Sequence, residues 1–268
     1  MIIDFHTHAF PSRIAAGAVD SLGKAADFAP LTDGTVADLQ KMLASANIDL
    51  GVILPVATRP DQFYSINRFA AEVCERTGVI SLGSIHPDDE TPTEHIKEIV
   101  KLGLKGIKLH PDFQGAYIDD ERFVRIVSTA LDEGLIVVTH AGIDPGFHGD
   151  GVGCTPQRAA ALIDRLCLGD DEAPVVFAHG GGYAMHKEVM KHLAGRRVYV
   201  DLSMTHKMSD ADAVTELVRA HGAKRVLFGS DCPWGHPAET IDFISNLQIS
   251  DEEKTAILGE NAERLLKI

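Results

Sequence analysis

Residues 2–8 read Ile2-Ile3-Asp4-Phe5-His6-Thr7-His8, and this stretch decides the fold. The two β-branched residues at its start favour a strand. Successive side chains of a strand point to opposite faces, so Asp4, His6 and His8 share one face. Two imidazoles side by side can chelate a divalent metal. A half-buried strand whose polar residues face water is the alternative, and the rest of the chain decides between the two.

Short apolar runs recur along the chain and predict eight strands. They cover residues 2–6, 50–54, 79–85, 104–109, 135–139, 175–178, 198–202 and 226–229. Most are nearly continuous in apolar character, which is typical of parallel strands covered on both faces. Amphipathic stretches of helical length lie between them. These predicted helices cover residues 35–46, 62–75, 94–102, 121–133, 157–168, 184–193, 211–221 and 238–247.

Start and stop signals agree with these helices. Thr91-Pro92-Thr93-Glu94 indicates an N-cap followed by Pro at the first helical position. The stretch 209–212 resembles a cap with an acidic third residue. Five glycines stand where helices should end, and they predict left-handed caps: Gly78, Gly103, Gly134, Gly195 and Gly222.

Strict alternation of strands and helices predicts a parallel sheet with right-handed crossovers. Eight units with nothing left over for a second domain predict a single α/β domain over residues 1–268, a closed (β/α)8 TIM barrel. An open doubly wound sheet is the alternative, but it normally has a Gly-rich loop after its first strand. The Ser250-x-x-Glu253 capping box predicts a last helix or pair of helices under the barrel.

Composition predicts a soluble globular protein. The chain has 268 residues, 45% of them apolar and 24% charged, and a formal net charge of −14, which disfavours nucleic acid and anionic membranes as partners. The four cysteines are scattered, without a C-x-x-C pair. No signal-peptide pattern is present, and no apolar run approaches the roughly 18 residues that span a bilayer. We therefore expect a cytoplasmic protein.

The carboxyl ends of the predicted strands carry most of the chemistry. In a closed barrel, side chains at these ends converge on one site. The residues at these ends are metal-ligating or charged: His6 and His8, Lys108 and His110, His140, His179, Asp201, and Asp231. Histidines and a carboxylate at equivalent strand ends favour a metal centre over histidines that are simply packed in the core.

With these strand-end residues, the sequence resembles the amidohydrolase superfamily, and more narrowly the amidohydrolase-related branch that includes aminocarboxymuconate-semialdehyde decarboxylase. The resemblance runs from the first strand to the 259–262 segment and so covers nearly the whole chain. The matching motifs are Asp4-Phe5-His6-Thr7-His8, Gly106-Ile107-Lys108-Leu109-His110-Pro111, Thr139-His140-Ala141-Gly142, His179-Gly180-Gly181-Gly182 and Phe228-Gly229-Ser230-Asp231-Cys232-Pro233-Trp234.

The resemblance implies that His6, His8, His140 and Asp231 bind one divalent metal, most often zinc. His179 would be a general acid/base or a ligand of a second metal. Asp231 would also take a proton from water that the metal activates. The physics agrees, because a metal with an open position lowers the pKa of its water to about 7, and a carboxylate beside it can move the proton.

Lys108 has three interpretations. In binuclear amidohydrolases a strand-four lysine is carbamylated and bridges two metals, whereas the decarboxylase-like members lack that bridge. Unmodified Lys108 would bind a substrate carboxylate, or it would form a structural salt bridge inside the barrel. His110 either reaches the pocket, where it could contact a second metal or substrate, or fixes its loop. Arg59, Asp201 and His206 are weaker candidates, and Arg59 would hold an anionic substrate.

Two further residues and a loop have less specific signals. Asp4 is expected to accept a hydrogen bond behind the ligands rather than to bind the metal. A nucleophilic Cys232 would need a neighbouring base and an exposed thiolate, so this interpretation is disfavoured. The Gly-rich loop at residues 148–150 is expected to be flexible rather than a lid.

We therefore expect a metal-dependent hydrolase that acts on a small carboxylated or cyclic molecule at an ester, lactone or amide bond. The cofactor would be one or two divalent ions, most often Zn²⁺. A metal-dependent, non-oxidative decarboxylase is the alternative, and a metal-binding protein without catalysis is the third. Lys108 favours hydrolysis, because the decarboxylases do not use a lysine there. A homodimer is expected only on the general ground that dimers are the commonest soluble oligomers.

Overall fold

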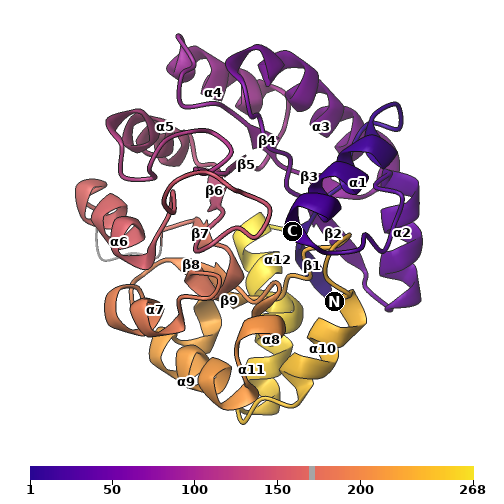
Figure 1. The fold of residues 1–268 in the computed structure, drawn as a ribbon, viewed down its shortest axis with the longest axis vertical. Helices are drawn as coiled ribbons and strands as arrows, with labels where there is room; N and C mark the ends of the chain where they lie inside the picture. Colours follow the sequence, from indigo (N-terminus) through magenta and orange to yellow (C-terminus); the bar gives the residue numbers. More distant parts are fainter. Residues whose placement is uncertain (169–172) are drawn as a thin grey trace.

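The strands lie side by side around a ring, in the order of the sequence (Figure 1). The computed structural model describes residues 1–168 and 173–268. All paired strands are parallel. The strands are β1 (Ile3–Thr7), β2 (Leu50–Ile53), β3 (Ile80–Ser81), β4 (Gly83–Ser84), β5 (Gly106–Leu109), β6 (Ile136–Thr139), β7 (Val175–Phe177), β8 (Tyr199–Asp201) and β9 (Val226–Leu227).

The ring closes, and the eight predicted strands are confirmed. β3 and β4 are the two halves of the predicted strand 79–85, and Leu82 between them donates its N–H to the Ile53 carbonyl at 2.9 Å. At the other seam, Phe5 of β1 donates to the carbonyl of Phe228, which follows β9, at 2.9 Å. The structure is therefore a (β/α)8 barrel, and the open doubly wound alternative is wrong.

The eight predicted helices are present, with ends that shift by at most three residues. They are α2 (Val36–Ser45), α3 (Phe63–Thr77), α4 (Pro92–Lys101), α5 (Glu121–Asp132), α6 (Pro156–Arg165), α7 (His186–His192), α9 (Ala211–His221) and α10 (Pro237–Ser245). The five predicted glycines have positive φ. Thr91 precedes α4, with Pro92 as its first residue, but its side chain makes no cap hydrogen bond.

Further helices lie in the loops. α1 (Ala15–Ala26) occupies much of the stretch between β1 and α2. α8 (Thr205–Met208) follows β8, and single turns of 3₁₀ helix form η1 (Pro60–Gln62), η2 (His179–Gly181) and η3 (Ala223–Arg225). Within residues 1–168 and 173–268, no helix has the length and apolar character needed to cross a membrane.

The last helices close the amino end of the barrel. The Ser250 capping box begins α11 (Asp251–Thr255), which continues through η4 (Ala256–Glu260) into α12 (Asn261–Leu266). Ala262, Leu265 and Leu266 pack with Ile3 and Phe5 in the interior of the ring. Figure 1 shows α12 near the centre of the ring. The carboxyl end of the barrel is therefore the end left for a site.

Candidate active site

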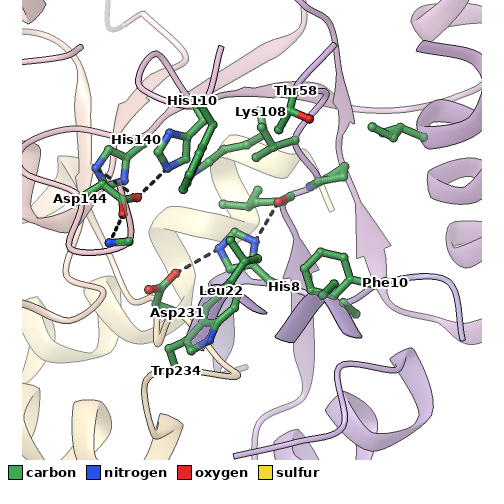
Figure 2. Close-up of a pocket in the computed structure, with 18 of the residues that line it drawn as sticks. His8, Phe10, Leu22, Thr58, Lys108, His110, His140, Asp144, Asp231 and Trp234 are labelled. Atoms are coloured by element: carbon green, nitrogen blue, oxygen red, sulfur yellow. Dashed lines mark hydrogen bonds and ion pairs between the residues drawn. The ribbon is translucent and has the colours of Figure 1, made fainter. Parts of the chain in front are cut away.

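A cavity of about 550 Å³ lies at the carboxyl ends of the strands. Figure 2 shows side chains from distant parts of the chain that face it. Its lining includes eight of the residues that the sequence analysis singled out: His6, His8, Arg59, Lys108, His110, His140, His179 and Asp231. Asp201, the remaining strand-end residue, is not among the lining residues. The sequence argument that strand ends converge therefore placed these residues correctly in space.

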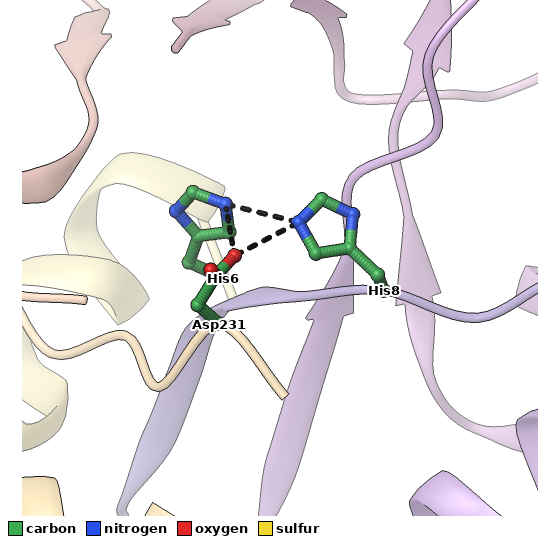
Figure 3. Close-up of side chains that lie close together, drawn as sticks. All are labelled: His6, His8 and Asp231. Carbon is green, nitrogen blue, oxygen red and sulfur yellow. Dashed lines mark hydrogen bonds and ion pairs between the residues drawn. The ribbon is translucent and has the colours of Figure 1, made fainter. Parts of the chain in front are cut away.

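Three of the four predicted metal ligands meet at one point (Figure 3). His6 Nε2 and His8 Nε2 are 3.2 Å apart. Asp231 Oδ1 lies 3.2 Å from His6 Nε2 and 3.0 Å from His8 Nε2. His6 and His8 come from β1 and its carboxyl end, and Asp231 comes from the turn after β9, so the group spans the seam of the barrel.

Hydrogen bonds to the far side of each imidazole fix which nitrogen faces this point. His8 Nδ1 lies 3.0 Å from the Leu54 carbonyl, which can only accept, so Nδ1 carries the proton. His6 Nδ1 lies 2.9 Å from Asp201 Oδ2 and donates to that carboxylate. Both Nε2 atoms therefore present lone pairs toward Asp231 Oδ1. Such backing hydrogen bonds are typical of metal-ligating histidines.

The turn that carries Asp231 is held by Asp4. Asp4 Oδ2 accepts a hydrogen bond from Ser230 Oγ at 2.6 Å, and Asp4 Oδ1 accepts one from the Ser230 backbone N–H at 2.9 Å. Asp231 has a φ of 68°, which L-residues rarely adopt, and its N–H donates to the His6 carbonyl at 2.8 Å. Asp4 thus supports the turn of Asp231 rather than an imidazole.

His140, the fourth predicted ligand, lies in an adjoining group. Its Nδ1 is 3.2 Å from His179 Nε2, and its ring stacks on that of His110 with centroids 4.2 Å apart. His179 Nδ1 donates to the Ser203 carbonyl at 3.2 Å, so His179 Nε2 accepts from His140 Nδ1. His140 Nε2 is therefore a lone pair, and it is buried without a hydrogen-bond partner.

Asp144 was missed by the sequence argument. Its Oδ2 lies 3.0 Å from His110 Nε2 and 4.0 Å from His140 Nε2 (Figure 2). The donor atoms of His110, His140 and Asp144 lie within 4.8 Å of one another and form a second group that could hold a cation. The available signal is a carboxylate four residues after a strand-end histidine, in the loop beyond the strand end.

The family model described as amidohydrolase matches residues 3–268, nearly the whole chain. The chain belongs to the amidohydrolase family. The sequence-based resemblance is thereby confirmed, and members of this family are enzymes.

Solved structures share the fold of this chain. LigW, a 5-carboxyvanillate decarboxylase from Sphingomonas paucimobilis, is 17% identical, with 100% of this chain and 99% of that chain covered and a TM-score of 0.70. A Pseudomonas putida protein assigned as a 2-pyrone-4,6-dicarboxylic acid hydrolase is 18% identical, with 99% and 97% covered and a TM-score of 0.66.

A third similar structure holds a metal. It is a 5-carboxyvanillate decarboxylase from Novosphingobium aromaticivorans with bound manganese and 3-methoxy-4-hydroxy-5-nitrobenzoic acid; it is 16% identical, with 100% of this chain and 97% of that chain covered and a TM-score of 0.69. No curated sequence matches this chain. At these identities the likeness shows the fold, and it does not choose between hydrolysis and decarboxylation.

Burial makes three of the site imidazoles poor bases. It lowers the pKa of His6 to about 3, with a further contribution from the charge of Lys108. Burial also lowers the pKa of His110 and holds that of His140 well below its usual range. Neutral imidazoles keep their lone pairs at neutral pH, which metal binding requires.

Two charges of opposite sign flank these imidazoles. Burial raises the pKa of the Asp231 carboxyl, but the hydrogen bond with His8 and the charge of His6 outweigh burial and hold it below its usual range. Burial lowers the pKa of Lys108 to about 8, against the charges of Asp201 and Asp231. Lys108 Nζ lies 3.4 Å from His6 Nε2. At neutral pH the floor of the cavity thus holds a carboxylate and, mainly, an ammonium.

The remaining walls are mostly apolar. They include Phe10, Leu22, Ile66, Phe69, Phe113 and Trp234. Arg59 stands at the opening with its side chain 64% exposed, and its Nε pairs with Asp61 at 3.1 Å. Cys232 is buried, and burial raises the pKa of its thiol, so it is no thiolate nucleophile at neutral pH. His206 and the 148–150 loop are not among the lining residues.

Proposed function

We propose that this protein is a metal-dependent hydrolase of a small, carboxylated or cyclic substrate, acting at an ester, lactone or amide bond. The observation that carries the proposal is the convergence of His6 Nε2, His8 Nε2 and Asp231 Oδ1 within 3.0–3.2 Å of one another at the floor of the cavity. The lone pairs of these three acceptor atoms repel one another, so a cation between them would stabilise the arrangement. Two imidazoles and a carboxylate are a donor set that suits Zn²⁺.

His6, His8 and Asp231 would hold the ion, with His140 as the fourth ligand. His140 is included because its Nε2 is a buried lone pair without a hydrogen-bond partner. When bound, a divalent ion supplies Lewis-acid chemistry, since it polarises a carbonyl oxygen and lowers the pKa of water in its open position. Manganese in a similar structure makes Mn²⁺ the second ion to test.

Asp231 and His179 would move protons. Asp231 is ionised and lies at the floor of the cavity, so it can accept a proton from the attacking water. The Ser203 carbonyl keeps a proton on His179 Nδ1, which leaves Nε2 as the atom that accepts and returns a proton. The leaving group would take up the proton that water gave to Asp231, either directly from Asp231 or through His179 Nε2, which here accepts a hydrogen bond from His140.

Lys108 and Arg59 would bind negative charge. Lys108 is 1% exposed, and its ammonium group lies beside His6 at the floor of the cavity. A fixed cation there stabilises the negative charge that develops on a carbonyl oxygen during hydrolysis. A carbamylated Lys108 would instead offer a carboxylate to two ions, with His110 and His179 available to the second. Arg59, at the opening, would attract a substrate carboxylate.

Decarboxylation is the second candidate, and the apolar walls favour it. A carboxylate loses solvation in apolar surroundings, which favours its conversion to neutral carbon dioxide. Phe69, Phe113 and Trp234 line the cavity and would surround a substrate ring. Two of the similar structures carry the name decarboxylase, which supports testing this reaction beside hydrolysis.

A product analysis separates the two reactions. The zinc-loaded protein would be incubated with cyclic acids, lactones and amides in water labelled with heavy oxygen. We expect one labelled oxygen in the product, no carbon dioxide, and loss of turnover when a chelator removes the metal. Carbon dioxide release without incorporation of the label would refute hydrolysis and establish the second candidate.

A variant tests the acid/base group in the same assay. His179→Asn removes the proposed proton carrier, so kcat should fall by about 10²–10⁴-fold while the metal stays bound. His192→Asn is the matched control, because His192 lies on α7 outside the cavity. Near-normal turnover of His179→Asn would remove His179 from the mechanism.

A further inference from the structure

Asp201 and Ser203, at the carboxyl end of β8, have no role in the mechanism above, yet both are fully buried directly behind the proposed ligands. Asp201 Oδ2 accepts the hydrogen of His6 Nδ1 at 2.9 Å. Asp201 Oδ1 accepts from the backbone N–H groups of His179 at 3.1 Å and Ser203 at 3.0 Å, and also from Ser203 Oγ. The carboxylate therefore connects one proposed ligand with the proposed acid/base group.

These contacts identify Asp201 as a support rather than a ligand. The atoms of His6, His179 and Asp201 lie close enough together to hold a cation. However, three donors already point at Asp201 Oδ1, and Oδ2 accepts a hydrogen bond from His6 Nδ1, so a cation there would have to displace these donors. The backbone N–H groups among these donors cannot be deprotonated to make room for a cation. The group is a hydrogen-bond network.

Ser203 connects the two imidazoles through its hydroxyl group. Its O–H donates to Asp201 Oδ1, which leaves the oxygen lone pairs to accept. Ser203 Oγ lies 2.9 Å from His179 Nδ1 and 3.1 Å from His6 Nδ1. Both ring nitrogens that face away from the cavity thus meet acceptors, and both rings must carry their proton on Nδ1.

We propose that Asp201 and Ser203 are positioning residues that hold His6 and His179 in the Nδ1-protonated tautomer, with both Nε2 lone pairs directed away from the Asp201–Ser203 pair. The inference rests on the proposed metal centre, since His6 can bind an ion through Nε2 only in this tautomer. Outer hydrogen bonds of this kind change metal affinity by about 10- to 100-fold.

Asp201→Asn tests the tautomer directly. The amide has one oxygen instead of two. If the amide oxygen takes the Oδ1 position and keeps its three donors, the NH₂ group faces His6 Nδ1. In wild type the carboxylate accepts a hydrogen bond from His6 Nδ1 at this place. His6 Nδ1 must then accept, and the ring proton moves to Nε2, toward His8 and Asp231. The substitution therefore places an N–H where the proposed ligand lone pair was.

The experiment measures tautomer and metal affinity separately. NMR of isotope-labelled histidine in metal-free protein reports which nitrogen of His6 is protonated, with the signals assigned by their loss in His6→Asn. Zn²⁺ affinity is measured by competition with a chelator. We expect an Nδ1 proton on His6 in wild type, an Nε2 proton in Asp201→Asn, and about 10- to 100-fold weaker Zn²⁺ binding in that variant.

Ser203 variants and a matched control complete the design. Ser203→Ala keeps the hydrogen bond between His6 and Asp201, so its loss of Zn²⁺ affinity should be smaller, up to about tenfold. Ser203→Thr should restore the Zn²⁺ affinity because it restores the hydroxyl group. Asp89→Asn is the control, since Asp89 is a buried carboxylate that pairs with His95 Nδ1 at 2.6 Å outside the cavity. It should leave Zn²⁺ affinity unchanged.

The outcomes separate this inference from the proposed function. Wild type that binds no Zn²⁺ would overturn the metal centre and this inference with it. Wild type that binds Zn²⁺, together with an Asp201→Asn variant of equal affinity and unchanged tautomer, would overturn the inference alone. If Asp201→Asn does not fold, Ser203→Ala carries the test through Zn²⁺ affinity alone, and an affinity equal to that of wild type in that variant would overturn the inference.

Discussion

At the scale of single residues, burial gives histidines in this chain two different uses. In the cavity, the Nε2 atoms of His6 and His8 converge near Asp231 and could bind a metal. His221, at the end of α9, is fully buried but lies outside the cavity, and its Nε2 donates to the Val198 carbonyl at 2.8 Å. It therefore acts as a hydrogen-bond donor between a helix and a strand, and its protonation affects stability rather than chemistry.

The buried His221 should lower the free energy of unfolding in mild acid. Burial lowers its pKa to about 4, and the charge of Arg225 contributes. Below a pH of about 6.5 the imidazole binds a proton in the unfolded chain, whereas in the folded chain it stays neutral. The free energy of unfolding therefore falls as pH falls toward about 4. This group should make the free energy of unfolding about 2 kcal/mol lower at about pH 5 than at about pH 7.

Urea unfolding of wild type and His221→Gln at the two pH values measures this contribution. The Gln side chain can still donate to the Val198 carbonyl but does not titrate, so the variant should lose less stability in acid. His192→Gln, in which a partly exposed histidine is replaced, serves as the control and should resemble wild type. Equal acid destabilisation of His221→Gln and wild type would contradict the prediction.

At the scale of elements, α1 forms a wall of the cavity. Ala15, Val19 and Gly23 are its buried residues. One turn apart along another side of the same helix, Ile14, Ala18, Leu22 and Ala26 line the cavity. The helix therefore carries two apolar sides, one buried and one that lines the cavity.

We predict that α1 sets the size of the substrate. Leu22→Trp adds volume to the cavity wall, and overfilling a packed site costs about 1–3 kcal/mol, so KM for a ring-sized substrate should rise about tenfold or more. Zn²⁺ affinity should not change, because Leu22 takes no part in the hydrogen bonds that orient His6 and His8. Steady-state kinetics with substrates of increasing size measure the effect.

The same helix supplies the control for this substitution. Ala16 is exposed and does not line the cavity, so Ala16→Trp should leave KM unchanged for every substrate. If Leu22→Trp and Ala16→Trp gave the same KM values as wild type, α1 would not be a wall that the substrate contacts.

At the scale of the whole molecule, the barrel and the location of the site were predictable because both depend on repeated patterns. Alternating apolar runs and amphipathic stretches specify the ring, and parallel strands bring their carboxyl ends together. His140, Lys108 and Asp231 therefore line one cavity although they lie far apart in the chain.

The contacts within the site were not predictable, because they depend on loop conformation. His179 and Asp231 both have positive φ, which no local pattern in the sequence indicates, and this conformation helps set where their side chains lie. Asp144 and Ser203 reach the cluster from positions beyond the strand ends. The ligand roles, the single domain, the cytoplasmic location and the homodimer stay predictions.

The proposed ion would also join the seam that closes the barrel. His8 follows β1 and Asp231 follows β9; they are 223 positions apart in the chain but 3.0 Å apart in space. An ion that binds both, and binds the unfolded chain weakly, stabilises the folded state by mass action. At a free concentration of about 100 times its Kd the gain is about 2.7 kcal/mol.

Thermal unfolding with buffered Zn²⁺ and with a chelator measures this gain. For a chain of this size about 1 kcal/mol shifts Tm by about 2–4 °C, so zinc should raise Tm by about 5–10 °C. Asp231→Asn removes the ligand on the β9 side of the seam and should lose most of the shift, whereas Asp89→Asn should keep it. An equal Tm with and without zinc in wild type would show that no ion joins the first strand to the last, because a ligand bound only to the folded barrel must stabilise it.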